Sequence, residues 1–182
     1  VVKCNAEHLW EVYRREDDKK LQMQTRHMMS MLEVAGKPRW RVKQPQYVTY
    51  WEEPDLPVDP YLVGVSLIHG VKVGEDMVLP PEVVLSQAIL KATPHNAHTN
   101  TFSISGHEEY YQTDDIHKGI RLGSYDERIR FLQGVMDHYA KATDNGNLTL
   151  EIVRPKVAAT IKEIICSIGG WCRITKLGNG SY

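Results

Sequence analysis

The stretches Leu62–Gly70 and Leu132–Ala140 read LVGVSLIHG and LQGVMDHYA, and they decide the expected fold. Each is a largely apolar run with a glycine, Gly64 or Gly134, at its third position. A glycine inside a helix costs roughly 1 kcal/mol relative to alanine, so its recurrence at one place needs a physical reason. Close approach of two helix backbones is such a reason. The sequence therefore predicts two helices that pack against each other at these glycines.

Local signals set the expected ends of both helices. Asp59 can cap the first helix, and Pro60 suits its first turn, where a missing N–H has no cost. Gly70 can end it. The second helix begins after Ser124, and Glu127 three residues later completes a capping box.

The C-terminal ends of the two helices should lie close together. Residues spaced by three, four and seven positions share one helix face. This places His69 and Tyr139 at the same end of the contact between the two helices, which we call the seam. Asp137 should point about 160° away from Tyr139 at 3.6 residues per turn. We expect Asp137 to stabilise its own half of the molecule.

The segments after each helix suggest an internal repeat of the order helix, strand, strand, helix. After the first helix we expect a short hairpin in 71–79, a helix over 82–91, a loop over 95–100 and a strand over 101–105. After the second, Asp144–Gly146 is a strong turn signal, and an alternating strand is expected over 147–153. Pro155 should start a helix through Ile168, and a final strand is expected over 171–177. The predicted class is α+β, with two pseudo-symmetric halves joined at the paired helices.

The first 55 residues read as a separate, β-rich appendage. Strands are expected over 2–4, 9–13, 39–42 and 47–51, with a helix over 25–34. The proline-rich run Glu52–Pro60 should be extended. We therefore expect one domain over residues 1–55 and a second over 56–182.

Composition excludes several classes of protein. The chain has 182 residues with 42% apolar content, enough for a core, and no apolar run long enough for a transmembrane helix. No secretory leader is seen, and the three unevenly spaced cysteines suggest reduced thiols. Twenty-two basic and 23 acidic residues give a net charge of −1, which argues against tight DNA binding because phosphate contacts need lysine and arginine. We expect a cytoplasmic protein.

The two glycine-containing stretches resemble the paired helices of LAGLIDADG (dodecapeptide-type) homing endonucleases. In that family an acidic residue at the eighth position of each helix holds Mg²⁺ for DNA cleavage. Those positions are His69 and Tyr139 here. Neutral imidazole is a poor ligand for Mg²⁺, and a phenol with a pKa near 10 is worse. The resemblance therefore implies a catalytically inactive relative with no bound cofactor, or with Mg²⁺ if cleavage is retained.

The same resemblance implies contact with duplex DNA through antiparallel strands in the major groove. Lys141, Arg154 and Lys156 are the candidate phosphate contacts in the second half, and Arg128 and Arg130 are further basic residues that could touch phosphate or simply be exposed. The first half offers only about nine residues before Pro80 for two strands, each spanning few contacts at ~3.3 Å per residue. We expect DNA binding to be weak or lost, and the protein to be a monomer.

The N-terminal stretch is similar to a splicing block of inteins written Thr-x-x-His. His8 matches the histidine of that block, and Asn5 stands in place of the threonine. The stretches Asp59–Leu62 and Ser167–Gly170 also read like inteins. This resemblance implies an intein (Hint-type) segment at the N-terminus, a host protein, and a microbial or phage-infected cell. Because the chain opens at Val1 and closes at Tyr182, no splicing is expected from it.

Three alternatives remain open at this stage. The chain could be an active, Mg²⁺-dependent, sequence-specific DNA endonuclease that uses unconventional ligands. It could be a DNA-binding module that does not cleave. It could also be an unrelated α/β domain with accidental motifs, which a structure without crossed helices at Gly64 and Gly134 would establish.

Overall fold

The computed structural model divides the chain into two compact units, Val1–Pro45 and Gln46–Tyr182. The structure describes residues 4–43, 46–50, 56–83, 85, 95–96, 98–112, 114–178 and 180–182. The division falls ten residues before the boundary expected at Asp55. Residues 46–50 belong to the second unit, where the Val48 N–H donates to the Ser167 carbonyl at 2.6 Å.

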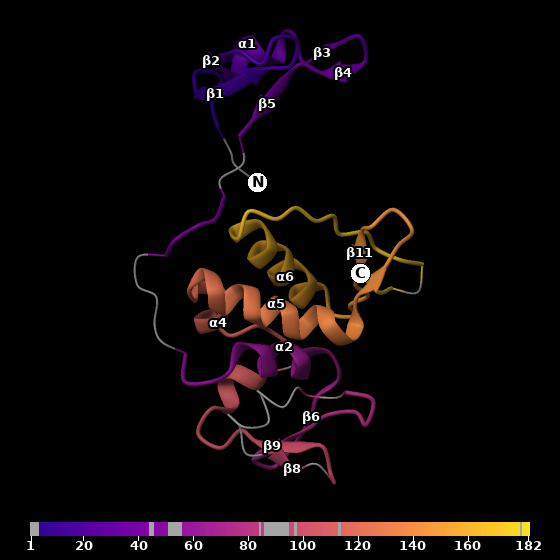
Figure 1. Cartoon of the computed structure of the whole chain (residues 1–182). Coiled ribbons are helices and arrows are strands. Elements are labelled where there is room, and N and C mark those ends of the chain that lie inside the picture. The colour runs from indigo at the N-terminus through magenta and orange to yellow at the C-terminus, as the bar shows by residue number, and fades with distance from the viewer. Residues whose placement is uncertain are drawn as a thin grey trace. The chain divides into compact units, whose positions relative to one another are not determined.

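The first unit is a small antiparallel sheet with one short helix (Figure 1). Its elements are β1 (Leu9–Arg14), β2 (Lys20–Gln24), α1 (Thr25–Met29), β3 (Glu33–Val34), β4 (Lys37–Pro38) and β5 (Trp40–Val42). The main sheet has the order β2-β1-β5, and β3 pairs with β4 in a separate hairpin. The strands predicted over 9–13 and 39–42 are confirmed as β1 and β5.

The helix predicted over 25–34 is too long, because α1 ends at Met29 and residues Glu33–Val34 pair as a strand. Left-handed backbone at Ala35 and Gly36, with φ of 51° and 70°, makes the tight turn of that hairpin. Of the strand predicted over 47–51, the described residues 47–50 are not a strand. Of the strand predicted over 2–4, residues 2 and 3 lie outside the described part, and Cys4 is not in a strand.

The second unit contains the two predicted helices and most of the core. Its elements, in chain order, are α2 (Pro60–His69), β6 (Val71–Val73), β7 (Asp76–Val78), β8 (His95–Asn96), β9 (Thr101–Ser103), the 3₁₀ helix η1 (Glu108–Tyr111), α4 (Lys118–Leu122), α5 (Tyr125–Tyr139), β10 (Lys141–Ala142), β11 (Leu148–Thr149) and α6 (Pro155–Ser167). The α+β class is confirmed. Among the described residues, no helix is long and apolar enough to cross a membrane.

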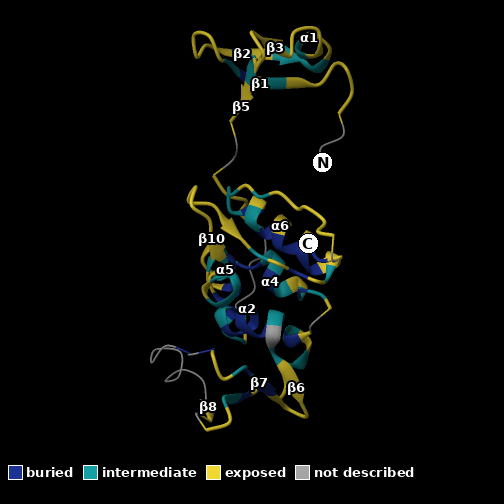
Figure 2. Cartoon of the chain, turned by 90° about the vertical axis from the view of Figure 1, so that its right-hand side faces the viewer, coloured by how far each residue is buried: buried dark blue, intermediate teal, exposed yellow. Residues whose placement is uncertain are grey.

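The helices of this unit lie in successive layers. Figures 1 and 2 both show α6 beside α5, α5 beside α2, and the sheet that contains β6 and β8 on the other side of α2. The buried side chains come from all of these layers; the largest fully buried apolar ones are Phe131, Leu62, Met77, Leu79, Ile104, Ile120 and Ile164. The core is therefore centred on α2, which has neighbours on both sides.

The two segments after the paired helices differ from the predicted repeat. After α2 the sheet has four antiparallel strands in the order β6-β7-β9-β8, so residues 95–96 are a strand rather than a loop. After α5 the hairpin β10–β11 has only two residues in each strand. The first half thus has the larger sheet, contrary to expectation. Of the helix predicted over 82–91, residues 84 and 86–91 lie outside the described part.

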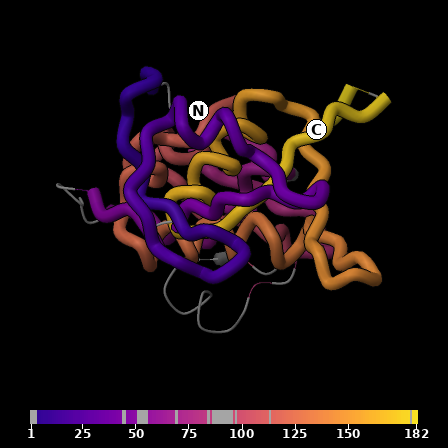
Figure 3. Tube along the Cα trace, turned by 90° about the horizontal axis from the view of Figure 1, so that it is seen from above, coloured from indigo at the N-terminus to yellow at the C-terminus, as the bar shows by residue number. Residues whose placement is uncertain are grey.

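The predicted helix that starts at Pro155 is confirmed as α6, but the strand expected over 171–177 is absent. After α6 the described residues run without regular secondary structure to the C-terminus, the yellow end of the trace in Figure 3. There Ile152 and Tyr182 exchange two backbone hydrogen bonds of 2.7 Å each. The last residue of the chain is thus tied by its backbone to the segment between β11 and α6.

Candidate functional site at the paired helices

Both paired helices begin at the predicted caps. The Asp59 carboxylate accepts the Tyr61 N–H at 2.9 Å, with Pro60 in the first turn of α2. At α5, the Ser124 hydroxyl accepts the Glu127 N–H at 3.2 Å, and the Glu127 carboxylate accepts the Ser124 N–H at 2.7 Å. These bonds satisfy N–H groups that a helix start leaves without partners, so local sequence fixes where both helices begin.

The two helices meet backbone to backbone at the predicted glycines. A Cβ atom placed on Gly64 would lie 2.2 Å from the Phe131 carbonyl oxygen of α5. A Cβ atom on Gly134 would lie 2.1 Å from the Tyr61 carbonyl oxygen of α2. Real Cβ atoms do not come this close to backbone, so both positions require glycine. The contact is reciprocal, because each glycine leaves room for the backbone of the other helix. We call this contact the glycine notch.

Polar contacts join the N-terminal parts of the same two helices. The Arg130 guanidinium donates to both Asp59 carboxylate oxygens, at 2.8 and 2.7 Å. Burial raises the pKa of the Asp59 carboxyl, but the bonds from Arg130 and the Tyr61 N–H outweigh it, so this pKa lies below its ordinary value. Asp59 therefore caps α2 and anchors it to α5 with one side chain.

At the C-terminal end of the seam, Tyr139 crosses to the other helix. Its hydroxyl donates to the Val65 carbonyl oxygen at 3.3 Å. Burial first, and the charge of Glu82 second, raise the pKa of Tyr139 to about 12. The phenol is therefore neutral near pH 7 and fills the seam. His69 is the last residue of α2, and its side chain lies outside the described part of the structure.

Asp137 contacts the partner helix rather than its own half alone, which corrects the prediction. The Tyr61 hydroxyl donates to the Asp137 carboxylate at 3.1 Å and lies 3.4 Å from Nε2 of His138. Burial, and after it the charge of Asp137, raises the pKa of Tyr61 to about 12. Asp137 lies on α5 where the long side chain of Tyr61 can reach it from α2, a contact that helix periodicity alone does not reveal.

Arg154 contacts the C-terminal end of α2. Its guanidinium donates to the Leu67 carbonyl oxygen, one of the last-turn carbonyls that an α-helix leaves without an intrahelical partner. Burial lowers the pKa of Arg154, against a smaller opposing effect of Asp114. A cation at this end also complements the helix dipole. The side chain that sequence suggested as a DNA contact thus binds the helix next to His69.

The residues at this end do not fit a Mg²⁺ site. Mg²⁺ requires oxygen ligands in near-octahedral geometry, usually including carboxylates. Of the two motif positions, Tyr139 offers a neutral phenol bonded to a backbone carbonyl, and the Arg154 guanidinium lies on the adjoining end of α2. Within the described residues, no group of three or more His, Cys, Asp or Glu side chains is arranged to hold a metal ion.

The remaining predicted residues are all exposed. Lys141 is exposed in β10. The Lys156 ammonium pairs with the Asp115 carboxylate at 2.7 Å, and the lysine side chain is 70% exposed. His8 is an exposed residue of the first unit whose ring packs edge-on to Trp10, with 4.7 Å between ring centroids.

Sequence reasoning treated Arg128 as a possible phosphate contact or an exposed charge, but its side chain is completely buried. Its guanidinium donates to the carbonyls of Gly123, at 3.0 Å, and of Val48, and to the Ser167 hydroxyl. Its charge also lies over the Tyr50 ring, 4.9 Å from the ring centroid. The sequence signal that could have indicated this burial is helical spacing. Arg128 lies four residues before Leu132 and seven before Val135, which are on the buried face of α5.

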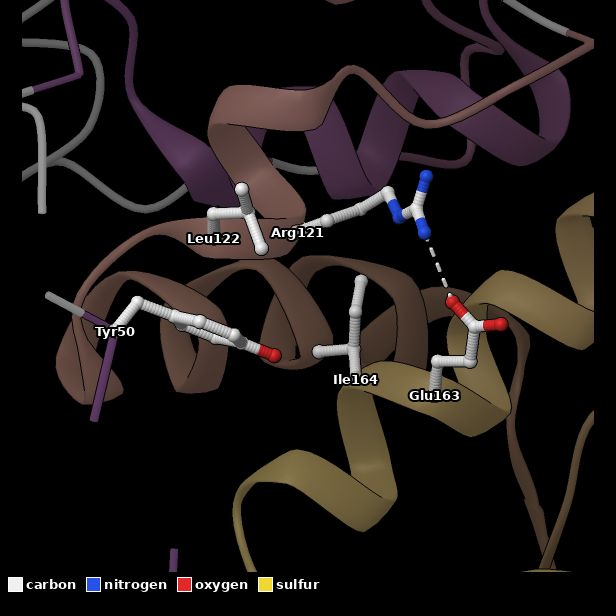
Figure 4. A pocket seen from close by; sticks show the side chains of 5 residues that line it. All are labelled: Tyr50, Arg121, Leu122, Glu163 and Ile164. Carbon is white, nitrogen blue, oxygen red and sulfur yellow. Dashed lines mark hydrogen bonds and ion pairs between the residues drawn. The ribbon is translucent and has the colours of Figure 1, made fainter. Parts of the chain in front are cut away.

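A small pocket near this cluster has a volume of only about 40 Å³ (Figure 4). It is lined by Tyr50, Arg121, Leu122, Glu163 and Ile164, and Arg121 donates to Glu163 across it at 3.0 Å. Small-molecule sites are typically about 300–1,000 Å³, so this pocket has room for a few water molecules but not for a substrate.

Comparisons of the chain with protein-family models, with curated proteins and with solved structures found no match.

Proposed function

We propose that residues 56–182 are a homing-endonuclease-like domain of the LAGLIDADG type that no longer cleaves DNA. In this proposal the domain derives from an intein, and residues 1–55 are part of the splicing domain. The observation that carries the proposal is the reciprocal glycine contact of α2 and α5. It occurs at the third position of both motif stretches, where the family's paired helices would meet.

Three features support the loss of cleavage. Tyr139 stands at an acidic position of the motif, and its hydroxyl is engaged by the Val65 carbonyl. Arg154 places a positive charge on the C-terminal end of α2, where a divalent cation would be repelled. His69 at the other acidic position offers an imidazole, which is a poor ligand for Mg²⁺.

The charge of the second unit supports weak DNA binding. Residues 46–182 contain 17 acidic and 12 basic side chains, a net charge of −5. Affinity for duplex DNA depends largely on neutralisation of phosphates by lysine and arginine. Of the three predicted phosphate contacts, Arg154 binds α2 and Lys156 pairs with Asp115. A surface of this sign repels DNA unless its basic residues gather on one face.

A cleavage assay tests the proposal. A supercoiled plasmid would carry the host gene with the insertion removed, and the full chain would be added with Mg²⁺ or Mn²⁺. We expect no linear product. The variant carrying His69→Asp and Tyr139→Asp serves as a comparison, because it restores the acidic positions. A metal-dependent double-strand break by the unaltered chain would contradict the loss of cleavage.

A second candidate function is a DNA-binding module without nuclease activity. The sheet β6-β7-β9-β8 favours it, since it is larger than the sequence predicted and β6 is exposed along its length. A gel-shift titration of residues 46–182 against the same insertion-site duplex distinguishes it. Binding that falls steeply with salt would support this candidate, and its absence at low salt would exclude it.

A further inference from the structure

The two units carry opposite net charges, although the whole chain is close to neutral. Residues 1–45 contain ten basic and six acidic side chains, a net charge of +4, against −5 for residues 46–182. The net charge of −1 for the whole chain does not reveal this difference. The folding of a small unit does not require a positive net charge. The charge of residues 1–45 therefore needs a separate explanation.

One face of the first unit's sheet carries an aromatic ring between two cations. Tyr13 of β1 is paired in register with Lys20 of β2 on one side and with Arg41 of β5 on the other. Side chains directly opposite in neighbouring strands lie on the same face. The Lys20 and Arg41 residues are exposed, and Tyr13 is partly exposed. We call the surface formed by Tyr13, Lys20, Arg41 and Lys43 the basic face.

The basic face borders an open hollow of about 400 Å³. The hollow is lined by Tyr13, Asp18, Arg41, Val42 and Lys43. Its lining therefore combines an aromatic ring, an aliphatic side chain and two cations with one carboxylate. The hollow is shallow and open to solvent, so a planar group can approach the exposed side of Tyr13.

The carboxylates on this surface are held in exposed ion pairs. Lys20 pairs with Glu11 at 2.8 Å, and Arg41 pairs with Asp18. In both pairs each side chain is at least 47% exposed. Exposed pairs contribute about 0–1 kcal/mol, so a phosphate can displace a carboxylate from either cation at little cost. Lys43 adds a third cation for which the described residues show no ion pair.

We propose that the basic face binds single-stranded nucleic acid. Lys20, Arg41 and Lys43 would neutralise phosphates, and Tyr13 would stack on a base that enters the hollow. Aromatic residues on a sheet surface beside a basic groove are a common way to bind unpaired bases. The strands here have three to six residues, and bases in a duplex do not expose their ring faces to Tyr13. The charge of the unit complements a polyanion.

This inference is independent of the proposed endonuclease-like function. It concerns a different unit, needs no metal ion and predicts binding without cleavage. Loss of either proposal therefore leaves the other standing, and the two are measured in different assays.

The test is fluorescence anisotropy of the full chain with labelled oligonucleotides of about 12 nucleotides, within the usual site sizes of single-strand binding proteins. The probes are oligodeoxythymidine, oligouridine and a DNA duplex of equal length, in a metal-free buffer at low and at physiological salt. Tyr13→Leu removes the ring and keeps an apolar side chain. Lys20→Gln with Arg41→Gln removes the two flanking cations.

A matched control removes the same charge from the other unit. Lys162→Gln with Arg173→Gln changes two exposed cations of residues 46–182, so it alters net charge equally. Circular dichroism checks that each variant keeps its fold. We expect the Lys20 and Arg41 double variant to bind at least about tenfold more weakly, and to lose roughly 1.4 from the salt slope at about 0.7 per contact. The control should bind nearly as well as the unaltered chain.

The variant Tyr13→Leu should bind single strands about tenfold more weakly, as expected for loss of one stacked base, and should not change duplex binding. The DNA and RNA single strands show which nucleic acid is preferred. The proposal is overturned if the unaltered chain binds no single strand at low salt. An equal loss of affinity in the control variant, or a preference for duplex that Tyr13→Leu leaves unchanged, would also overturn it.

Discussion

Helices α2 and α5 share the glycine notch but differ in their surroundings. In α2, every residue from Leu62 to Leu67 is buried, because α5 packs on one side and the four-stranded sheet on the other. In α5, burial is confined to one face that includes Phe131, Leu132 and Val135. The same glycine pattern therefore occurs in a central helix and in an amphipathic helix, so the pattern alone does not decide how deeply its helix is buried.

The segments after the helices explain this difference. The sheet beyond α2 gains its third strand from β9, which pairs with β7 across about 25 residues of chain. Beyond α5 the hairpin is minimal, and the half is held instead by Arg128 and by the C-terminal residues beside Ile152. The contact of α2 and α5 thus depends on the two glycines, whereas the segments that follow each helix complete the core with different and distant residues.

Gly134→Ala should have the largest effect, because it acts on the feature the two halves share. Its Cβ would lie 2.1 Å from the Tyr61 carbonyl oxygen, so one helix must move. We expect destabilisation of about 3 kcal/mol, the upper range for overpacking, despite the helix propensity of alanine. Urea unfolding monitored by circular dichroism at the helix band measures it, since most helical residues lie in the second unit.

Gly178→Ala is the control for this prediction. No atom lies within 4 Å of the Cβ position at Gly178, and its φ is not in the left-handed region. Its free energy of unfolding should change by less than about 0.5 kcal/mol. Equal stability of both variants would show that the helices do not meet at the notch.

Arg128→Met should have the next largest effect, and it sharpens the contrast between the halves. The change leaves the Gly123 and Val48 carbonyls and the Ser167 hydroxyl without the guanidinium donors. Unsatisfied buried polar groups cost about 1–3 kcal/mol each, offset in part by removal of a buried charge. We expect a net loss of about 2 kcal/mol in urea unfolding. Arg173→Met, at an exposed position, should be nearly neutral, and a similar loss there would contradict this role.

The features that sequence predicted correctly depend on nearby residues. The Asp59 cap, the Ser124–Glu127 capping box and the turn after β6 are all decided within a few positions. The glycine contact was predicted because two separate stretches carry the same costly residue at the same place.

The features that sequence missed depend on distant residues. Pairing of β8 with β9 turned an expected loop into a strand, and residues 171–177, expected to be a final strand, have no regular secondary structure. Arg154 reaches Leu67 across 87 positions, so its assignment to DNA could not be tested without a fold. Periodicity reports which face is buried but not which segment covers it.

The pH dependence of stability should show the smallest effect. It reports on the ion pair of Asp59 and Arg130 separately from the glycine contact. The folded-state pKa of Asp59 is below its unfolded value, so its contribution is present above about pH 4 and is lost as the pH falls through the folded pKa. In Asp59→Asn, the fall in the free energy of unfolding between pH 5 and pH 2 should be smaller than in the unaltered chain by up to about 1 kcal/mol. Identical profiles for the variant and the unaltered chain would show that the Arg130 pair contributes nothing.

The most direct test of the central claim is a Mn²⁺ titration monitored by electron paramagnetic resonance, which detects the free ion. The account holds that the ends of α2 and α5 offer no anionic oxygens at the positions of His69 and Tyr139. It predicts no stoichiometric site in the unaltered chain up to millimolar Mn²⁺, and a gain of binding in the variant with His69→Asp and Tyr139→Asp. One tight site in the unaltered chain that Tyr139→Phe abolishes would contradict the account.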